Sequence, residues 1–385
     1  MWPLFYPRTS QDPSWLYCGL ATNAALYSGL HHAKPLQPPL RVLGVAPTSI
    51  HSRVHAWLGT FLASSYLSMF NGLPPLIAGV AELDATERFV REYPIPREFA
   101  YQVMVQRVMS KFMNVLMNDA REPINYSLVQ LVDGELDNLR TSFPTEWTPR
   151  VEFNALVAKM HLYGMAVLRV HHNPSTRDII LKLGLSSSLR IIYLAEAGLG
   201  FTSDSHPGIQ PPSLYSVLPK NYFRGVLFTC IFLIRYFALN TRATTEEQEV
   251  ARNHLAIAHK ILQSGSIGNL VDCQRAAILI EILGRQEPSD ADNVKLRIDS
   301  RMGASLILDA ITTSHTLIGR ETIQPPIQPQ PLQYSPNSNE TAPEIANQSA
   351  FDFGVEGFGS MDFSSLPEDL WGDNLWTMFD MGPPV

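Results

Sequence analysis

The chain of 385 residues has few charged side chains, few cysteines and no long apolar run. Only 17% of its residues are charged while 45% are hydrophobic, which is enough to form a large core and excludes disorder from end to end. Its cysteines, Cys18, Cys230 and Cys273, are too few and too far apart for a disulfide framework or a Cys-x-x-Cys metal site. We expect buried, reduced thiols in a cytosolic or nuclear protein.

Signals for secretion or membrane insertion are also missing. The first eight residues do not combine a charged segment with a following apolar one, so we expect no secretory signal. The longest apolar stretch, residues 226–234, lies between Arg224 and Arg235 and is shorter than the about 20 residues that a membrane helix needs. The sequence therefore predicts no membrane contact.

Clusters of basic residues are absent as well. The 29 Lys and Arg residues include no adjacent pair, and the net charge is −7. A nucleic-acid surface that is readable from sequence normally shows basic clusters. Direct binding of DNA or RNA by this chain is therefore disfavoured, and any contact with DNA is expected to be indirect.

The charge is divided unevenly along the chain. Arg320 is the last basic residue, and residues 321–385 hold ten acidic ones. Residues 1–320 carry 26 acids and 29 bases, a net charge of +3. The body of the protein is thus nearly neutral, and its C-terminal segment is a polyanion.

The pattern of apolar residues predicts an all-α fold, a large multi-helix domain with a disordered acidic C-terminal tail. Strand-like alternation is scarce, whereas helical spacing recurs between breaks rich in Pro and Gly at residues 35–47, 71–75, 93–96 and 198–212. The clearest apolar stripe consists of Leu156, Met160, Tyr163, Val167 and Val170. Lys159 and Arg169 lie outside this stripe. Similar windows cover residues 15–30, 54–69, 99–117, 222–239, 246–262, 270–283 and 291–311.

Composition divides the chain into three parts. Residues 1–320 form the predicted helical domain. Residues 321–350 are rich in Pro, Gln and Asn and lack apolar periodicity, so they cannot offset the entropy of ordering and are predicted to be a disordered linker. Residues 351–385 hold seven aromatic residues and no Lys or Arg, which indicates an acidic-aromatic activation segment that binds a partner.

Local signals in the last part favour a helix that forms on binding. Residues 365–368 have the Ser-x-x-Glu form of a capping box, and Pro367 is tolerated in a first turn. The apolar side chains that follow share one face suited to a partner's groove. The predicted partner-binding residues are Phe363, Leu366, Leu370, Trp371, Leu375, Trp376, Met378 and Phe379. The alternative is a last helix that docks on this protein's own body, which the proline-rich linker and the uniform charge disfavour.

Sequence patterns of common enzymes are not found. The chain has no Gly-x-Ser-x-Gly, no phosphate loop and no His-Glu-x-x-His. His51 and His55 have the spacing of two metal ligands on a helix, but no third ligand is apparent. Residues 198–200 contain a Gly-x-Gly after a weakly strand-like stretch, residues 189–194, and are interpreted as a turn. We predict no catalytic residue, cofactor or metal.

Two pairs of adjacent histidines are also interpreted as ordinary residues. They are His31 with His32 and His171 with His172. Neighbouring residues on a helix do not face the same way, so neither pair is expected to bring its two rings together.

Several stretches resemble the middle homology region of fungal zinc-cluster transcription factors. Residues 12–32 are similar to its "G-L-A … A-L … G-L-H" helix, and residues 53–76 to its "R-x-x-x-W … S … G-x-P" segment. Residues 218–225, 272–276 and 301–309 resemble later helices of the branch of weak-acid-response and secreted-protease-gene activators. The six-cysteine zinc cluster, the basic linker and the coiled coil of that family are missing, so the resemblance implies neither zinc nor DNA binding here.

The residues that carry the resemblance suit structural roles. Gly19 is expected to allow close approach of helices, Gly72 to turn the chain, and Trp57 and Tyr66 to fill volume. Arg53, and likewise Arg275, could pair with buried carboxylates or carbonyls.

The resemblance implies a nuclear, all-helical domain that transmits a signal or restrains a DNA-binding module. The predicted function is a transcription regulator, an activator or co-activator whose tail contacts the transcription machinery or a co-activator. It would reach DNA through a DNA-binding partner or through an N-terminal zinc cluster in a longer product. The alternative is a small-molecule-sensing helical domain, since apolar pockets between helices are common ligand sites. An enzyme is disfavoured because no set of acid, base and nucleophile can be named.

Overall fold

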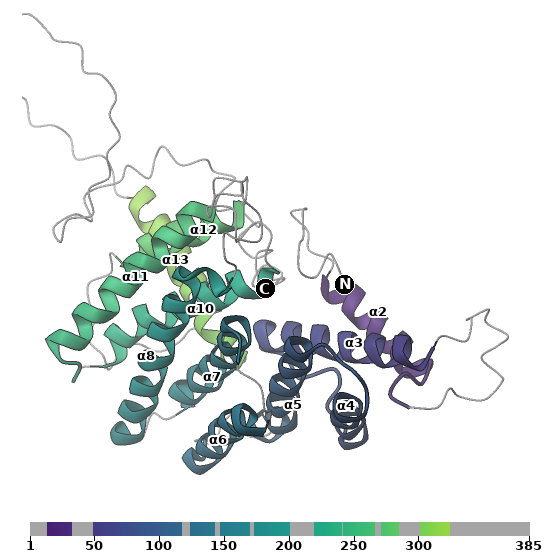
Figure 1. Ribbon diagram of the computed structural model, residues 1–385. Helices are drawn as coiled ribbons and strands as arrows, with labels where there is room; N and C mark the ends of the chain where they lie inside the picture. The colour runs from purple at the N-terminus through teal and green to yellow at the C-terminus, as the bar shows by residue number, and fades with distance from the viewer. Residues whose placement is uncertain are drawn as a thin grey trace, which may run out of the picture.

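The computed structural model describes residues 14–32, 49–117, 124–142, 147–169, 173–200, 219–240, 242–265, 271–284 and 301–323. Over these residues the protein is all-α, as predicted: they form eleven α-helices and one short 3₁₀ turn, and no strand (Figure 1). The helices of the first half are α2 (Ser14–Tyr27), α3 (Ile50–Asn71), α4 (Val80–Glu92), α5 (Arg97–Met117) and α6 (Tyr126–Ser142). Those that follow are α7 (Pro149–Arg169), α8 (Pro174–Glu196), α10 (Lys220–Leu239), α11 (Thr245–Gly265), α12 (Val271–Gly284) and α13 (Ala304–Ile323).

Several helix ends are set by capping residues. Helix α3 begins after Ser49, whose hydroxyl accepts the backbone N–H of Ser52 at 3.2 Å, and it ends at Gly72 with a φ of 61°. Helix α8 begins after Asn173, whose side chain accepts the N–H of Thr176 at 3.1 Å. Such side chains satisfy backbone donors that have no partner inside the helix.

Helix α11 begins with a reciprocal capping box. The N–H of Glu247 donates to the Thr244 hydroxyl at 3.1 Å, and the Glu247 carboxylate accepts the N–H of Thr244 at 3.0 Å. This bond to the backbone of Thr244 lowers the pKa of Glu247. Two donors at the start of α11 are thus satisfied by one pair of side chains.

Two helices form the centre of the molecule. Helix α7 packs against α5, α6, α8, α10 and α13, and α10 packs against α7, α8, α11, α12 and α13. In Figure 1, α2 to α6 lie on one side of α7, and α8 and α10 to α13 lie on the other. Between residues 151 and 167 of α7 only Glu152 and Leu156 are not buried. The last helix, α13, also reaches α3 in the first half of the chain.

The predicted windows coincide with eight of these helices, and three helices were missed. Helices α4 and α6 are rich in polar residues, but their buried residues have helical spacing, as Val129, Val132, Leu136 and Leu139 of α6 show, so the periodicity was present in the sequence. Residues 189–194, interpreted as weakly strand-like, lie inside α8, so that interpretation was wrong. The strand preference of two neighbouring isoleucines is weaker than the tendency of the whole capped segment of 23 residues to form a helix. Within the predicted window 291–311, residues 301–303 are not helical and Met302 has a φ of 48°.

None of the helices in the described ranges is both long enough and apolar enough to cross a membrane.

Candidate functional site

The predicted partner-binding residues of the tail lie outside the described residues, so their positions stay a prediction. They are Phe363, Leu366, Leu370, Trp371, Leu375, Trp376, Met378 and Phe379. The candidate site in the body is therefore built from the residues that carry the sequence motifs and from the interior groups that they contact.

Three glycines, Gly72, Gly164 and Gly303, allow α3, α7, α10 and α13 to come into close contact. We call these three residues the glycine junction. A Cβ atom on Gly303 would stand 2.9 Å from the backbone oxygen of His161. One on Gly164 would stand 3.0 Å from the Phe228 ring and 3.1 Å from Leu306. Any side chain larger than the hydrogen of glycine would push these helices apart. Close approach of the helices at the junction therefore requires glycine.

Gly72 ends α3 in a left-handed conformation at the same junction. Its N–H donates to the carbonyl of Met69 at 3.3 Å, and the N–H of Leu73 donates to the carbonyl of Ser68 at 2.8 Å. This arrangement is a glycine C-cap that satisfies two free carbonyls of the helix end. The prediction that Gly72 turns the chain is confirmed.

His161 lies at the centre of the junction and was not singled out from the sequence. Its ring stacks on Phe228 with centroids 4.3 Å apart and meets the edge of Phe70 at 5.0 Å. The side chain is 3% exposed, and burial lowers the pKa of His161 to about 3. Its Nε2 has no hydrogen-bond partner among the described residues. The imidazole is therefore neutral and serves as an aromatic spacer between α3 and α10.

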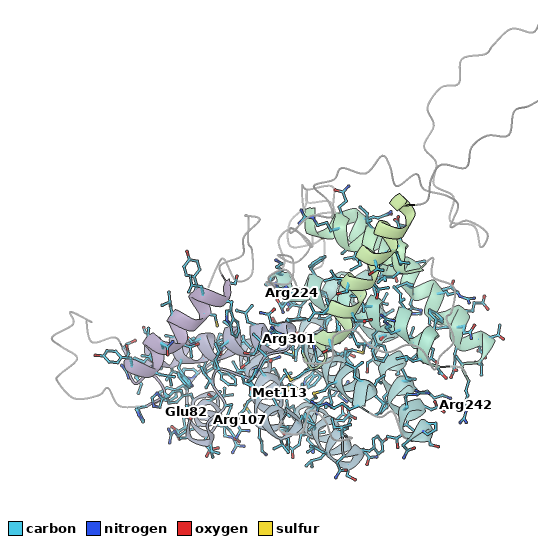
Figure 2. All side chains as sticks on the ribbon, turned by 180° about the vertical axis from the view of Figure 1, so that it is seen from behind. Glu82, Arg107, Met113, Arg224, Arg242 and Arg301 are labelled. Atoms are coloured by element: carbon cyan, nitrogen blue, oxygen red, sulfur yellow. The ribbon has the colours of Figure 1, made fainter. Side chains whose placement is uncertain are left out.

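A second group of buried polar side chains links α7 and α10 and lies close to Tyr66 of α3. The Asn154 amide donates to the Tyr222 hydroxyl at 3.2 Å, and the Asn221 amide donates to the Asn154 oxygen at 3.1 Å. Burial, and then the nearby Tyr222 hydroxyl, raise the pKa of Tyr66 well above its ordinary value. Directional bonds of this kind fix how two apolar helices are rotated against each other. Figure 2 labels Arg224 of α10 and Arg301, which precedes α13, near the middle of the molecule.

The first motif residues connect α2, α3 and α4. A guanidinium nitrogen of Arg53 donates to the carbonyl of Gly29 at 2.8 Å, just after α2 ends. The Trp57 indole, which is fully buried, donates to the Thr86 hydroxyl at 3.0 Å. The predicted pairing of Arg53 with buried carbonyls and the packing role of Trp57 are confirmed, while the partner of Arg275 stays a prediction. The role expected for Gly19 was wrong, because a Cβ atom there would meet nothing within 4 Å.

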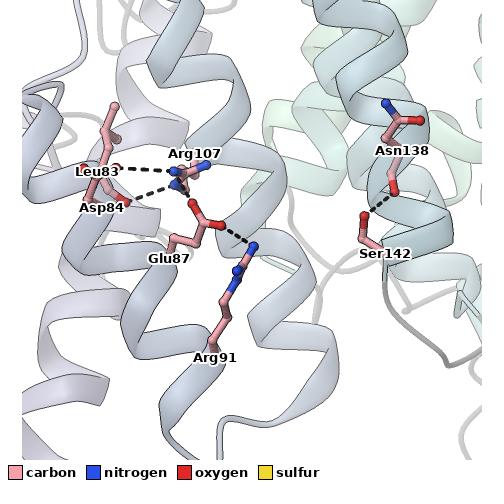
Figure 3. Close-up of polar contacts among 7 residues, drawn as sticks. All are labelled: Leu83, Asp84, Glu87, Arg91, Arg107, Asn138 and Ser142. Atoms are coloured by element: carbon pink, nitrogen blue, oxygen red, sulfur yellow. Dashed lines mark hydrogen bonds and ion pairs between the residues drawn. The ribbon is translucent and has the colours of Figure 1, made fainter.

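An arginine joins α4 to α5 in the same half of the body. Figure 3 shows the Arg107 guanidinium between α4 and α5, donating to the carbonyl of Leu83 at 3.0 Å and pairing with Glu87 and Asp84. Glu87 also pairs with Arg91, one turn further along α4, at 2.5 Å. The Arg107 side chain is only 14% exposed, so this network is less screened by solvent than an ordinary surface pair.

Helices α10 and α13 are joined by a buried ion pair between Arg235 and Asp309. Asp309 is 3% exposed as a side chain, and burial lowers the pKa of Arg235. Asp309 is the last residue of the motif at residues 301–309, so that motif also has a structural role in the body.

The structure shows the surroundings of Lys159, and the expectation for the rings of His31 and His32 was wrong. Lys159, placed off the apolar stripe of α7, is buried and pairs with Asp133 at 2.9 Å, because α6 covers that face of α7. His31 and His32 do bring their rings together, with centroids 3.9 Å apart, because they lie in the turn after α2 and not on a helix. His171 and His172 lie outside the described residues.

The three cysteines are buried free thiols, and burial raises the pKa of Cys18. His51 and His55 are exposed, and the Nδ1 of His55 is bonded to the carbonyl of His51 at 2.8 Å. Over the part of the chain that the structure describes, no group of three His, Cys, Asp or Glu side chains could hold a metal ion.

Comparison with known proteins finds transcriptional regulators of fungi. Over 338 residues, 82% of this chain and 30% of the relative, it is 24% identical to the protein of Eremothecium gossypii named "Putative transcription factor SEF1". This chain is thus similar to fungal proteins that are named as transcription regulators. It is also 25% identical over 177 residues, 44% of the chain, to the transcriptional regulatory protein SEF1 of Candida albicans. The matched region spans about a third of the length of the Eremothecium gossypii protein and about a fifth of the length of the Candida albicans protein. No protein-family model and no solved structure matches significantly.

The sequence motifs indicated Gly72 and Arg53 but not the residues that they contact in the folded protein. His161 carries no local signal, since it stands within an apolar helix like any core residue. Gly164, three residues further along α7, was the one hint, because a glycine inside a helix costs stability and usually has a packing reason.

Proposed function

We propose that this chain is the regulatory and activating portion of a transcription regulator. The observation that carries the proposal is the similarity over 82% of the chain to a protein named as a transcription factor. The roles found for the motif residues agree with it: Arg53, Gly72 and Asp309 hold helices together rather than form a reaction centre. We infer a non-enzymatic protein that acts by binding other macromolecules.

The acidic segment at residues 351–385 is the proposed activation element. It would bind the transcription machinery or a co-activator through its aromatic and aliphatic side chains, with its acids keeping that face in solvent when it is unbound. The sparse, separated basic residues favour recruitment to DNA by a partner or by a zinc cluster elsewhere in a longer product. Activity in transcription places the protein in the nucleus.

The proposal is tested by joining residues 351–385 to a neutral DNA-binding domain and measuring a reporter gene. We expect activation, and we expect loss of activation when Trp371, Leu375 and Phe379 are replaced together by Ala. The matched control is Thr377→Ala, which changes the same predicted helix on the side away from Trp371, Leu375 and Phe379 and should keep activation. Full activity of the triple variant would refute the role of that face.

A second candidate, a ligand-sensing domain, is favoured by unsatisfied polar atoms in the interior. The hydroxyl of Ser68, the side-chain oxygen of Asn71 and Nε2 of His161 are buried near the glycine junction and have no hydrogen-bond partner within the described ranges. Buried polar atoms are normally satisfied, so a small polar molecule could supply these bonds. A ligand that binds only the folded protein raises its melting temperature. Unchanged melting of the full chain across a panel of metabolites would exclude this candidate.

A further inference from the structure

Helix α2 exposes four large apolar residues to solvent. Leu16, Tyr17, Leu20 and Tyr27 are 63%, 50%, 60% and 67% exposed. With Ala24 they form the outer face of α2, which spans an arc of about 100° when successive residues are placed 3.6 to a turn. The fully buried residues of the same helix are Ser14, Cys18, Thr22 and Ala25, which are all small, and Trp15 and Leu26 are partly buried at the edge of that side.

This arrangement differs from that of an ordinary amphipathic helix, because α2 is apolar on its outer face as well as on its inner one. A helix that only covers a core places Leu and Tyr inward and small or polar residues outward. Here the small side lets α2 lie on α3, where Cys18 packs with Ala63 and Leu67. The two leucines and two tyrosines contribute little to that contact. A contiguous apolar face of this kind marks a surface that binds another protein.

The chemistry of the helix points to a second copy of the same chain. Helix α2 contains no Asp, Glu, Lys, Arg or His. Two copies can therefore approach face to face without charge repulsion, whereas the acidic segment at residues 351–385 would find no cation on this helix to pair with its carboxylates. An uncharged apolar patch is self-complementary, as a two-fold symmetric contact requires.

The size of the face also suits a symmetric pair. Four side chains that each expose roughly 100–150 Å² give about 500 Å² per copy, and about 1,000 Å² for two copies is the lower bound for a specific interface. Two α2 helices crossing at Leu20 would bury the leucines at the centre and the tyrosines at the ends, where their hydroxyls stay in water.

We propose that two copies of this chain associate through the outer face of α2. The inference goes beyond the proposed function and does not depend on it. A dimer would carry two tails at once, so a partner with two binding sites would bind both with a higher effective concentration.

The test measures the molar mass of the full chain by sedimentation equilibrium over a wide range of concentrations. We expect a monomer–dimer equilibrium, with the dissociation constant raised at least about a hundredfold by Leu20→Glu, because two carboxylates would meet across the two-fold axis. The matched control is Leu131→Glu, which changes a leucine of α6 that is 51% exposed and should leave the dissociation constant unchanged. Circular dichroism checks that both variants keep their helices.

Cross-linking supplies a second readout that does not rely on weakening the dimer. Leu20→Cys should form an intermolecular disulfide under mild oxidation, whereas Leu131→Cys should not. A wild-type protein that stays monomeric throughout, or an equally tight dimer of Leu20→Glu, overturns the proposal. Thiol labelling of Leu20→Cys that rises when Trp371, Leu375 and Phe379 are replaced by Ala would instead assign the face to the tail, and would also overturn it.

Discussion

The backbone oxygen of Arg301 lies 1.9 Å from the point where a Cβ atom on Gly72 would stand. These residues are more than two hundred positions apart, and their contact joins the end of α3 to the turn before α13. Gly72 also has a φ of 61°, a conformation that side chains other than glycine adopt at a cost. One residue thus serves both as a helix cap and as the surface on which the last helix packs.

Gly72→Ala should destabilise the protein by on the order of 3 kcal/mol, because the left-handed conformation and the overlap with Arg301 both oppose a methyl group. The measurement is the free energy of unfolding from urea titration followed by circular dichroism. Gly134→Ala is the matched control, since a Cβ atom there meets nothing within 4 Å in α6, and it should stabilise by about 0.5–1 kcal/mol. Equal effects of the two substitutions would contradict the packing role of Gly72.

His161 should make the protein sensitive to acid. Its pKa in the folded state is lowered to about 3 by burial, and the unfolded chain has an ordinary histidine pKa of about 6.5. Between these values the unfolded state binds one more proton, so the free energy of unfolding should fall by about 1.4 kcal/mol for each pH unit below about 6.5. Urea titrations between these pH values measure the slope.

His161→Phe isolates that contribution, because a phenyl ring can stack on Phe228 without taking up a proton. The variant should show a slope smaller by about 1.4 kcal/mol per pH unit over the same range. His55→Gln, at an exposed position of α3, should keep the wild-type slope. A slope that is the same in His161→Phe and wild type would show that His161 is not buried as a neutral ring.

The capping box of α11 should contribute measurably to stability. Thr244→Ala removes the hydroxyl that accepts the N–H of Glu247 and should lower the free energy of unfolding by about 1 kcal/mol. Thr245→Ala changes the exposed neighbour inside the helix and serves as the control. The measurement is thermal unfolding of both variants. A Thr244→Ala protein as stable as the control would contradict the contribution of the capping box.

Breaking the ion pair between α10 and α13 should be costly. Asp309→Ala leaves the guanidinium of Arg235 in the interior without this carboxylate, and a loss of about 3–5 kcal/mol is expected. Replacing both residues with apolar ones, Arg235→Met together with Asp309→Leu, should restore part of the stability because no charge is then buried. Chemical unfolding of the two variants gives the comparison, and a double variant less stable than Asp309→Ala would contradict it.

The sequence by itself determined the helical fold and the approximate position of most described helices. Helical periodicity depends on residues three and four apart, so α3, α5, α7 and α10 could be located without any knowledge of their neighbours. The turn at Gly72 follows from local backbone chemistry, whereas the carbonyl that Arg53 binds, that of Gly29, belongs to another part of the chain. The polar helices α4 and α6 were missed although their buried residues have helical spacing, because their many polar residues lower the overall hydrophobicity of both segments.

Only the tertiary structure decided which surfaces meet. That Lys159 is buried, that His161 lies between Phe70 and Phe228, and that α2 turns Leu20 toward solvent all depend on residues distant in the chain. The sequence of a helix does not fix the rotation of the helix about its axis. That rotation is set by packing and ion pairs with the neighbouring helices. In α2 the choice places small residues against α3, which no local pattern of hydrophobicity would have favoured.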